Sequence, residues 1–187
     1  MNIIPFLILF TILISEDTYK EPLYTVIEQS FPIELRQYDE YIVAKISVDK
    51  KKIDNDSNMF RVLASYIFGA NKNNENIPMT APVTTYEDKD SYNMIFYMLN
   101  AEDLNELPDP ENSNIKLEKI ILDKCAVIQF SWFTTDYRVQ RLKKKLQEYL
   151  DENNLKPISP FMINRYDPPW RLPFLRRNEI IVKVSNY

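Results

Sequence analysis

The sequence predicts an α+β fold in which two similar halves form a distorted antiparallel β-barrel that carries two helices. Short segments with β-strand patterning recur along the chain, and two longer segments have helical periodicity. The chain also matches itself when it is shifted by 82 residues, which predicts an internal duplication. The 187 residues suffice for one domain with a short appendage. We therefore expect each half to run strand-strand-helix-strand-strand.

Nine segments have the composition and length of β-strands. Ile33–Tyr38 alternates between apolar and polar residues, which predicts a strand with one face on the core and the other in solvent. The expected strands span residues 23–29, 33–38, 41–48, 77–86, 92–99, 115–122, 125–133, 161–166 and 179–184.

Two segments between these strands are predicted to be helical. The first covers residues 57–70, with Ser57 as its N-cap and Gly69 near its end. The second covers residues 135–152, and its apolar residues keep to an arc of about 100°, as in a helix that lies on a sheet. The apolar residues of the first helix cover about 240°, which is more than one sheet can bury. Part of its surface must therefore meet another segment of the chain, a partner or an apolar ligand. These residues are Met59, Phe60, Val62, Leu63, Ala64, Ile67 and Phe68.

The shift of 82 residues aligns two predicted repeats, about 31–99 and about 113–185. It needs no gap through two strands, a helix and the following proline. Two such halves are expected to pair around a pseudo-twofold axis. The aligned pairs include Ile33 with Ile115, Ala44 with Ala126, Phe60 with Leu142, Ala64 with Leu146 and Phe68 with Leu150.

The composition excludes most common catalytic and metal sites. The chain has no histidine, one glycine and one cysteine. It therefore cannot form a Ser-His or Cys-His dyad, a glycine-rich phosphate loop, an intramolecular disulfide or a cysteine-cluster metal site. Cys125 lies in an apolar run and is expected to be a buried thiol. The net charge of −4 gives no reason to expect nucleic-acid binding. We predict no catalytic residues and no metal site.

The N-terminus, residues 1–18, is predicted to be a signal peptide. Residues 3–14 are almost all apolar, and the sequence turns polar at Ser15. About a dozen apolar residues is the length of a signal-peptide core and is too short to span a bilayer. An uncleaved membrane anchor and a buried N-terminal strand or helix are the alternatives. We expect an exported protein with a mature domain at 19–187 and no stable membrane span after the signal is removed.

Several longer strings resemble the SOUL haem-binding protein family. The two most specific are IPMTAPV at residues 77–83 and RYDPPWRLPFLRRNE at residues 165–179. EPLY at 21–24, IELRQY at 33–38 and YIFGAN at 66–71 also match, so the resemblance extends from about Glu21 to the C-terminus. It implies a duplicated α+β barrel similar to bacterial effector-binding domains, in agreement with the repeat.

The resemblance also implies that the protein binds haem or a related tetrapyrrole, without catalysis, in an apolar groove beside the first helix. The implied groove positions on that helix are Phe60 and Ala64, with Leu63 and Ile67 adjacent. On the loop before the last strand, Trp170 is placed to stack on the macrocycle and Arg171 to pair with a propionate. With no histidine in the chain, the haem would lack a histidine axial ligand. The alternative is a module that binds another amphipathic small molecule or a protein partner and has no role with haem.

Overall fold

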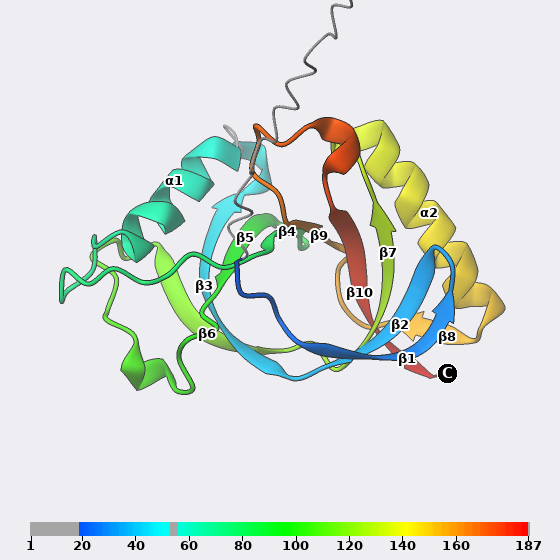
Figure 1. Ribbon diagram of the computed structural model, residues 1–187, viewed down its shortest axis with the longest axis horizontal. Helices are drawn as coiled ribbons and strands as arrows, with labels where there is room; N and C mark the ends of the chain where they lie inside the picture. Colours follow the sequence, from blue (N-terminus) through cyan, green and yellow to red (C-terminus); the bar gives the residue numbers. More distant parts are fainter. Residues whose placement is uncertain (1–18, 53–55, 187) are drawn as a thin grey trace, which may run out of the picture.

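The computed structural model describes residues 19–52 and 56–186, which form one curled sheet and two α-helices (Figure 1). The predicted signal peptide lies outside these residues. The helices are α1 (Asp56–Ile67) and α2 (Asp136–Glu152). Three short 3-10 helices are η1 (Lys50–Lys52), η2 (Leu104–Glu106) and η3 (Pro173–Leu175). The strands are β1 (Tyr24–Ser30), β2 (Ile33–Tyr38), β3 (Glu40–Asp49), β4 (Val83–Glu87), β5 (Ser91–Tyr97), β6 (Ile115–Ile121), β7 (Lys124–Phe130), β8 (Leu155–Pro157), β9 (Met162–Arg165) and β10 (Asn178–Asn186).

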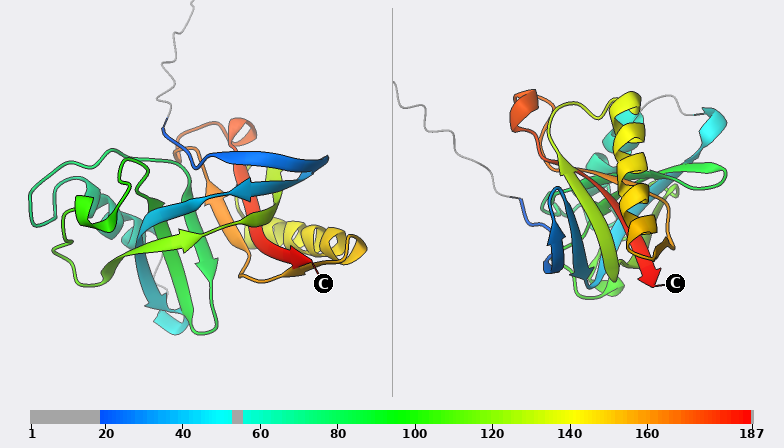
Figure 2. Two further views of the ribbon diagram at one scale, coloured as in Figure 1. Left: turned by 90° about the horizontal axis from the view of Figure 1, so that it is seen from below. Right: turned by 90° about the vertical axis from the view of Figure 1, so that its right-hand side faces the viewer.

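The strands follow the order β1-β2-β7-β10-β9-β4-β5-β3-β6, and β8 pairs with β10 beside this path. All the strand pairs are antiparallel. The sheet curls into a distorted half-barrel, and the helices lie on its outer side at opposite flanks (Figures 1 and 2). The α+β architecture predicted from the sequence is therefore confirmed.

The strand order also shows the duplication. In the order from β2 to β6, each strand of the first half has an equivalent in the second half: β2 and β6, β3 and β7, β4 and β9, and β5 and β10. Exchanging the members of each pair gives the same order read from the other end. The register agrees, because Ile33 pairs with Ile128 where β2 meets β7, and Ile46 pairs with Ile115 where β3 meets β6. Each residue of one pair lies 82 positions from its equivalent in the other pair. The pseudo-twofold axis therefore passes between β4 and β9.

The helices follow an offset of 83 residues, one more than the offset predicted from the sequence. Leu63 and Leu146 are both 0% exposed, and Ile67 and Leu150 are also fully buried. The gapless alignment instead set Ala64 on Leu146, which would put a half-buried residue opposite a core residue. One additional residue before α2 accounts for this difference, because a helix must turn its apolar arc toward the sheet.

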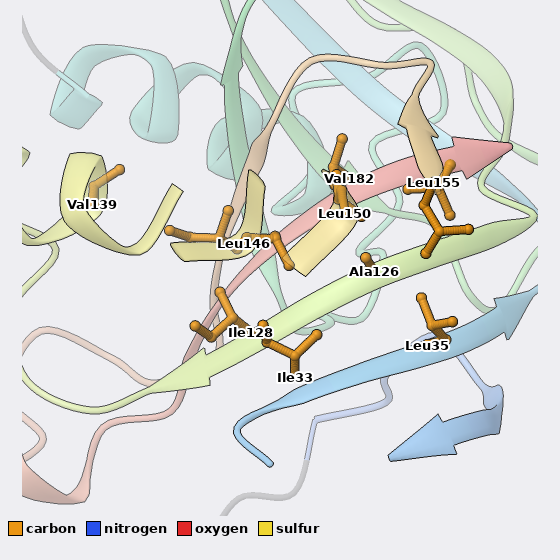
Figure 3. Close-up of a cluster of buried hydrophobic side chains, with 11 residues drawn as sticks. Ile33, Leu35, Ala126, Ile128, Val139, Leu146, Leu150, Leu155 and Val182 are labelled. Carbon is orange, nitrogen blue, oxygen red and sulfur yellow. The ribbon is translucent and has the colours of Figure 1, made fainter. Parts of the chain in front are cut away.

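The interior divides into three clusters. α2 packs on one half of the sheet, where Leu146 and Leu150 point toward Ile128 and Ala126 of β7 (Figure 3). α1 packs on the other half, with Leu63 and Ile67 among the buried residues. The third cluster lines the inside of the curl and includes Val43, Cys125 and Ile181. All the buried residues of these clusters lie within residues 33–184, so a chain without residues 1–18 retains them.

Three local predictions differ from the structure. Residues 77–82 are not a strand, because the prolines at 78 and 82 lack the N–H that a ladder needs, and β4 begins only at Val83. The three-residue strand β8 has too few residues to be recognised from its pattern. The polar face of β2 is not in solvent, since the sheet curls over it and buries Arg36 to 2% exposure.

Candidate ligand-binding surface

The outer side of α1 carries an apolar stripe made of Phe60, Ala64 and Phe68, hereafter the α1 stripe. These residues are four positions apart, so they lie on one face of the helix and its C-terminal continuation. Phe60 is 42% exposed and Phe68 is 67% exposed, while Ala64 between them is half-buried. The Phe60 ring packs against Phe96 of β5, with a centroid distance of 5.3 Å. The α1 stripe is therefore anchored on the core but remains open to solvent.

The same positions on α2 provide an internal reference. With the offset of 83, the α1 stripe corresponds to Lys143, Gln147 and Asp151. On α2 these side chains are polar, and Gln147 donates a hydrogen bond to Asp151 at 2.8 Å. One helix therefore presents a polar outer face and the other an apolar one. Large exposed apolar residues in such a position indicate a binding surface.

The loop of residues 166–177 begins near the first turn of α1. It follows Arg165, whose guanidinium lies 3.6 Å from the Asp56 carboxylate and donates hydrogen bonds to Thr85 and Thr134. Arg165 thereby ties the end of β9 to the start of α1, to β4 and to the segment before α2. This placement fixes the base of the loop beside the first turn of α1.

Charged side chains hold the loop in shape. The Asp167 carboxylate accepts a hydrogen bond from the backbone N–H of Arg177 at 2.6 Å, and it lies 3.6 Å from Arg171 Nε. Arg176 Nε donates to the Arg171 carbonyl at 2.9 Å. Trp170, which is 82% exposed, stands at the outside of this loop. The loop therefore presents an aromatic ring and a guanidinium next to each other on a fixed backbone.

A buried ion pair lies inside the curl beneath the base of the loop. Arg36 of β2 binds Glu179 of β10 at 3.0 Å, and both side chains are 2% exposed. Tyr166 donates to the other Glu179 oxygen at 2.6 Å, and Arg36 donates to the Tyr38 hydroxyl at 3.1 Å. Every charge in this cluster has a partner, which burial requires. The cluster fills the inner face of the sheet with structure rather than leaving it open for a ligand.

The pKa shifts in this cluster keep its charges fixed. Burial by itself lowers the pKa of Arg36, but the charge of Glu179 and the contacts with Tyr38 outweigh it and raise the pKa above its ordinary value. Burial and then the charge of Glu179 raise the pKa of Tyr166 and of Tyr38. The tyrosines therefore stay neutral and the arginine stays charged near neutral pH, so the cluster offers no group poised for proton transfer.

The residues predicted from the resemblance fall into two sets. Phe60, Ala64, Trp170 and Arg171 are wholly or partly accessible. Leu63 and Ile67 face the sheet at 0% and 1% exposure, so they support the α1 stripe from beneath and do not line it. Phe68 was not among the predicted site residues, and the helical spacing from Phe60 through Ala64 is the signal that identifies it.

The described residues also form hollows away from the α1 stripe. One of about 170 Å³ lies between the segment after α1 and the segment after β5, lined among others by Ile77, Met98 and Leu107. Another of about 340 Å³ lies near Leu35 and Leu155. Neither is lined by the α1 stripe, Trp170 or Arg171.

The described residues contain no cluster of three or more acidic, cysteine or histidine side chains that could hold a metal ion. Cys125 is fully buried, donates to the Leu122 carbonyl at 3.3 Å and has a pKa that burial raises to about 12. Burial therefore disfavours the thiolate form of Cys125. In the same residues, no helix has the length and apolar content to cross a membrane.

The comparison with family models identifies the chain. The model of the SOUL heme-binding protein matches residues 19–183. The chain belongs to the SOUL family. None of the curated proteins matches it.

Solved structures share the fold of this SOUL protein at low sequence identity. The C-terminal domain of EcmrR is 14% identical, with a TM-score of 0.65 over 88% of this chain and 99% of that domain. A hydrolase from Listeria innocua is 10% identical, with a TM-score of 0.56 over 85% of this chain and 94% of the other. An uncharacterized conserved protein from the same organism is 10% identical, with a TM-score of 0.62 over 82% and 92%. At these identities the likeness concerns the fold alone.

Proposed function

We propose that this SOUL protein binds haem or a related tetrapyrrole, without catalysing a reaction, on the α1 stripe and the neighbouring loop. The observation that carries the proposal is the apolar outer face of α1, at positions where α2 carries Lys143, Gln147 and Asp151. A flat apolar macrocycle is a suitable partner for two exposed phenylalanines on one helical face. Membership of the family supports the choice of ligand class.

The binding energy on this surface comes mainly from apolar contact. Each Å² of apolar surface removed from water contributes about 25 cal/mol. Phe60 and Phe68 supply that surface on the helix, and Trp170 supplies a ring on the loop. Arg171 is suited to a propionate, which would compete with Asp167 for the guanidinium. Such a charge-assisted contact contributes about 1.5–3 kcal/mol when it is partly removed from water.

Iron ligation adds little in this proposal, because the chain has no histidine and its thiol is buried. The same fact favours a second candidate, a planar amphipathic molecule without a metal. Both candidates use the same residues and differ only in whether iron increases the affinity.

Titration of residues 19–187 with haemin, followed by the Soret band, tests the proposal. Phe68→Asp should weaken binding at least about tenfold, because it places a carboxylate on the apolar face. Gln147→Ala is the matched control at an outer position of α2 and should leave the affinity unchanged. No spectral change on titration, or equal affinity in both variants and the parent protein, would contradict the proposal.

Export of the protein also remains a proposal, supported by the apolar run at residues 3–14. N-terminal sequencing of the protein from its native host tests it. A mature chain that starts at Met1 in the cytosol would contradict it.

A further inference from the structure

A second apolar surface lies at the end of the molecule where α2 begins. Six large side chains gather there, each between 49% and 78% exposed, and we call them the end patch. They come from the segment that leads into α2, from the first turn of α2 and from the loop before β10. They are Trp132, Phe133, Tyr137, Leu172, Phe174 and Leu175.

The two loops of the end patch are joined by direct contacts. The backbone N–H of Trp132 donates to the Pro173 carbonyl at 2.8 Å, and Asn178 donates to the Trp132 carbonyl at 2.9 Å. The Arg176 guanidinium covers the Phe133 ring at 4.9 Å. In Figure 1 and in the right-hand view of Figure 2, η3 and the start of α2 lie at the same, upper end of the molecule. The end patch is therefore one built surface and not a scatter of single residues.

The charge around the end patch has the opposite sign to that of the chain. Residues 131–141 and 166–177 carry five arginines and two aspartates, a net charge of +3, which the Glu21 carboxylate on Arg177 reduces to +2. The whole chain carries −4. Aromatic and leucine side chains surrounded by arginines are typical of surfaces that lie in the headgroup region of a bilayer. An anionic lipid surface complements both the apolar residues and the charge.

The start of the described chain lies near the same loop. Glu21 forms an ion pair with Arg177, two residues after η3. Glu21 thereby holds the start of the described chain beside the loop of the end patch.

We propose that the end patch docks the protein onto the surface of an anionic lipid bilayer, with Phe174 and Leu175 of η3 inserted among the lipids. This inference goes beyond tetrapyrrole binding and does not depend on it. It concerns the domain of residues 19–187 itself, so it holds whether or not the N-terminal segment is removed.

Co-sedimentation of residues 19–187 with vesicles tests this proposal in the absence of porphyrin. The protein should bind vesicles of phosphatidylcholine and phosphatidylglycerol more tightly than vesicles of phosphatidylcholine alone, and added salt should weaken the binding. The double variant Phe174→Ser/Leu175→Ser should lose at least about tenfold in affinity for the mixed vesicles. Ile121→Ser is the matched control, because Ile121 is 56% exposed at the end of β6.

Several outcomes would overturn the proposal. These are no binding to the mixed vesicles, equal binding by the double variant and the parent, or an equal loss in Ile121→Ser. A dimer in solution that the double variant abolishes, with no vesicle binding, would assign the end patch to a second copy of the chain instead. The vesicle assay contains no porphyrin and the haemin titration contains no lipid, so failure of one proposal leaves the other standing.

Discussion

The two helices hold equivalent places in the two halves of the molecule, but only the sheet-facing sides of the helices are alike. Leu63 and Ile67 of α1 match Leu146 and Leu150 of α2, and all four are fully buried. The outer sides differ, since α1 carries the apolar stripe and α2 carries polar residues. Folding requires only the shared positions. The difference between the two outer faces is therefore the basis of our proposal that α1 binds a ligand.

The shared positions should dominate stability. Leu63→Ala and Leu146→Ala each remove a fully buried side chain and should each lower the free energy of unfolding by about 2–5 kcal/mol. Urea unfolding followed by circular dichroism measures both values. If the free energy of unfolding falls much further in one variant than in the other, the two helices do not support equivalent cores. The two halves would then not be equivalent in stability.

The outer positions should dominate binding instead. Phe60→Lys gives α1 the residue that α2 has at the equivalent position, Lys143. Affinity for haemin should fall at least tenfold, or about 1.4 kcal/mol, while the free energy of unfolding changes less than in Leu63→Ala because Phe60 is 42% exposed. Lys143→Ala serves as the control for both measurements. If Phe60→Lys lowered the free energy of unfolding as much as Leu63→Ala does, Phe60 would belong to the core.

The sequence predicted most of the sheet because its strands obey a repeat. The pairing of Ile33 with Ile128 and that of Ile46 with Ile115 are related by the 82-residue offset, so one implies the other, but the offset does not show which strands pair. The offset of the helices was wrong by one residue, since a wide apolar arc such as that of α1 fits more than one rotation about the helix axis. Only contact with the sheet shows that Leu63, and not Ala64, is the core residue.

The polar interior was not predictable from the same pattern. Alternation along β2 shows that Arg36 lies opposite the face of Leu35, but it cannot distinguish solvent from the inside of a curled sheet. The partner, Glu179, is 143 residues away in the chain. A pair of buried charges at that separation leaves no local signal. For the candidate surface, the resemblance supplied Phe60, Ala64, Trp170 and Arg171, and only burial separated them from Leu63 and Ile67.

The two halves also carry different residues at one buried position, and a single substitution makes this position the same in both. Cys125 of β7 corresponds to Val43 of β3, and both are 0% exposed. Burial raises the pKa of the Cys125 thiol from 9.0 to about 12. Above pH 9 the unfolded chain loses this proton while the folded chain retains it, so the thiol lowers stability as the pH rises from 9 toward 12. Cys125→Val removes this loss.

At pH 7 the thiol is neutral in the folded and the unfolded chain, so the difference in stability between Cys125→Val and the parent reports only packing and the lost hydrogen bond to the Leu122 carbonyl. From pH 7 to pH 10 this difference should shift by about 1.4 kcal/mol in favour of the variant. Chemical unfolding at the two pH values measures the shift, and the buried tyrosines cancel because both proteins contain them. An unchanged difference at pH 10 would mean that the thiol of the folded protein ionises as freely as in the unfolded chain.

The smallest expected effect concerns the metal and shows what the α1 stripe recognises. If apolar contact with Phe60, Phe68 and Trp170 supplies the affinity, protoporphyrin IX without iron should bind within about threefold of haemin, a difference of about 0.7 kcal/mol. Quenching of tryptophan fluorescence follows both titrations through the protein, so the two dissociation constants can be compared directly. A hundredfold weaker binding of the metal-free ring would assign about 2.7 kcal/mol to iron. In that case a side chain of this histidine-free protein would have to ligate the metal, and the difference between the outer faces of α1 and α2 would no longer account for binding by itself.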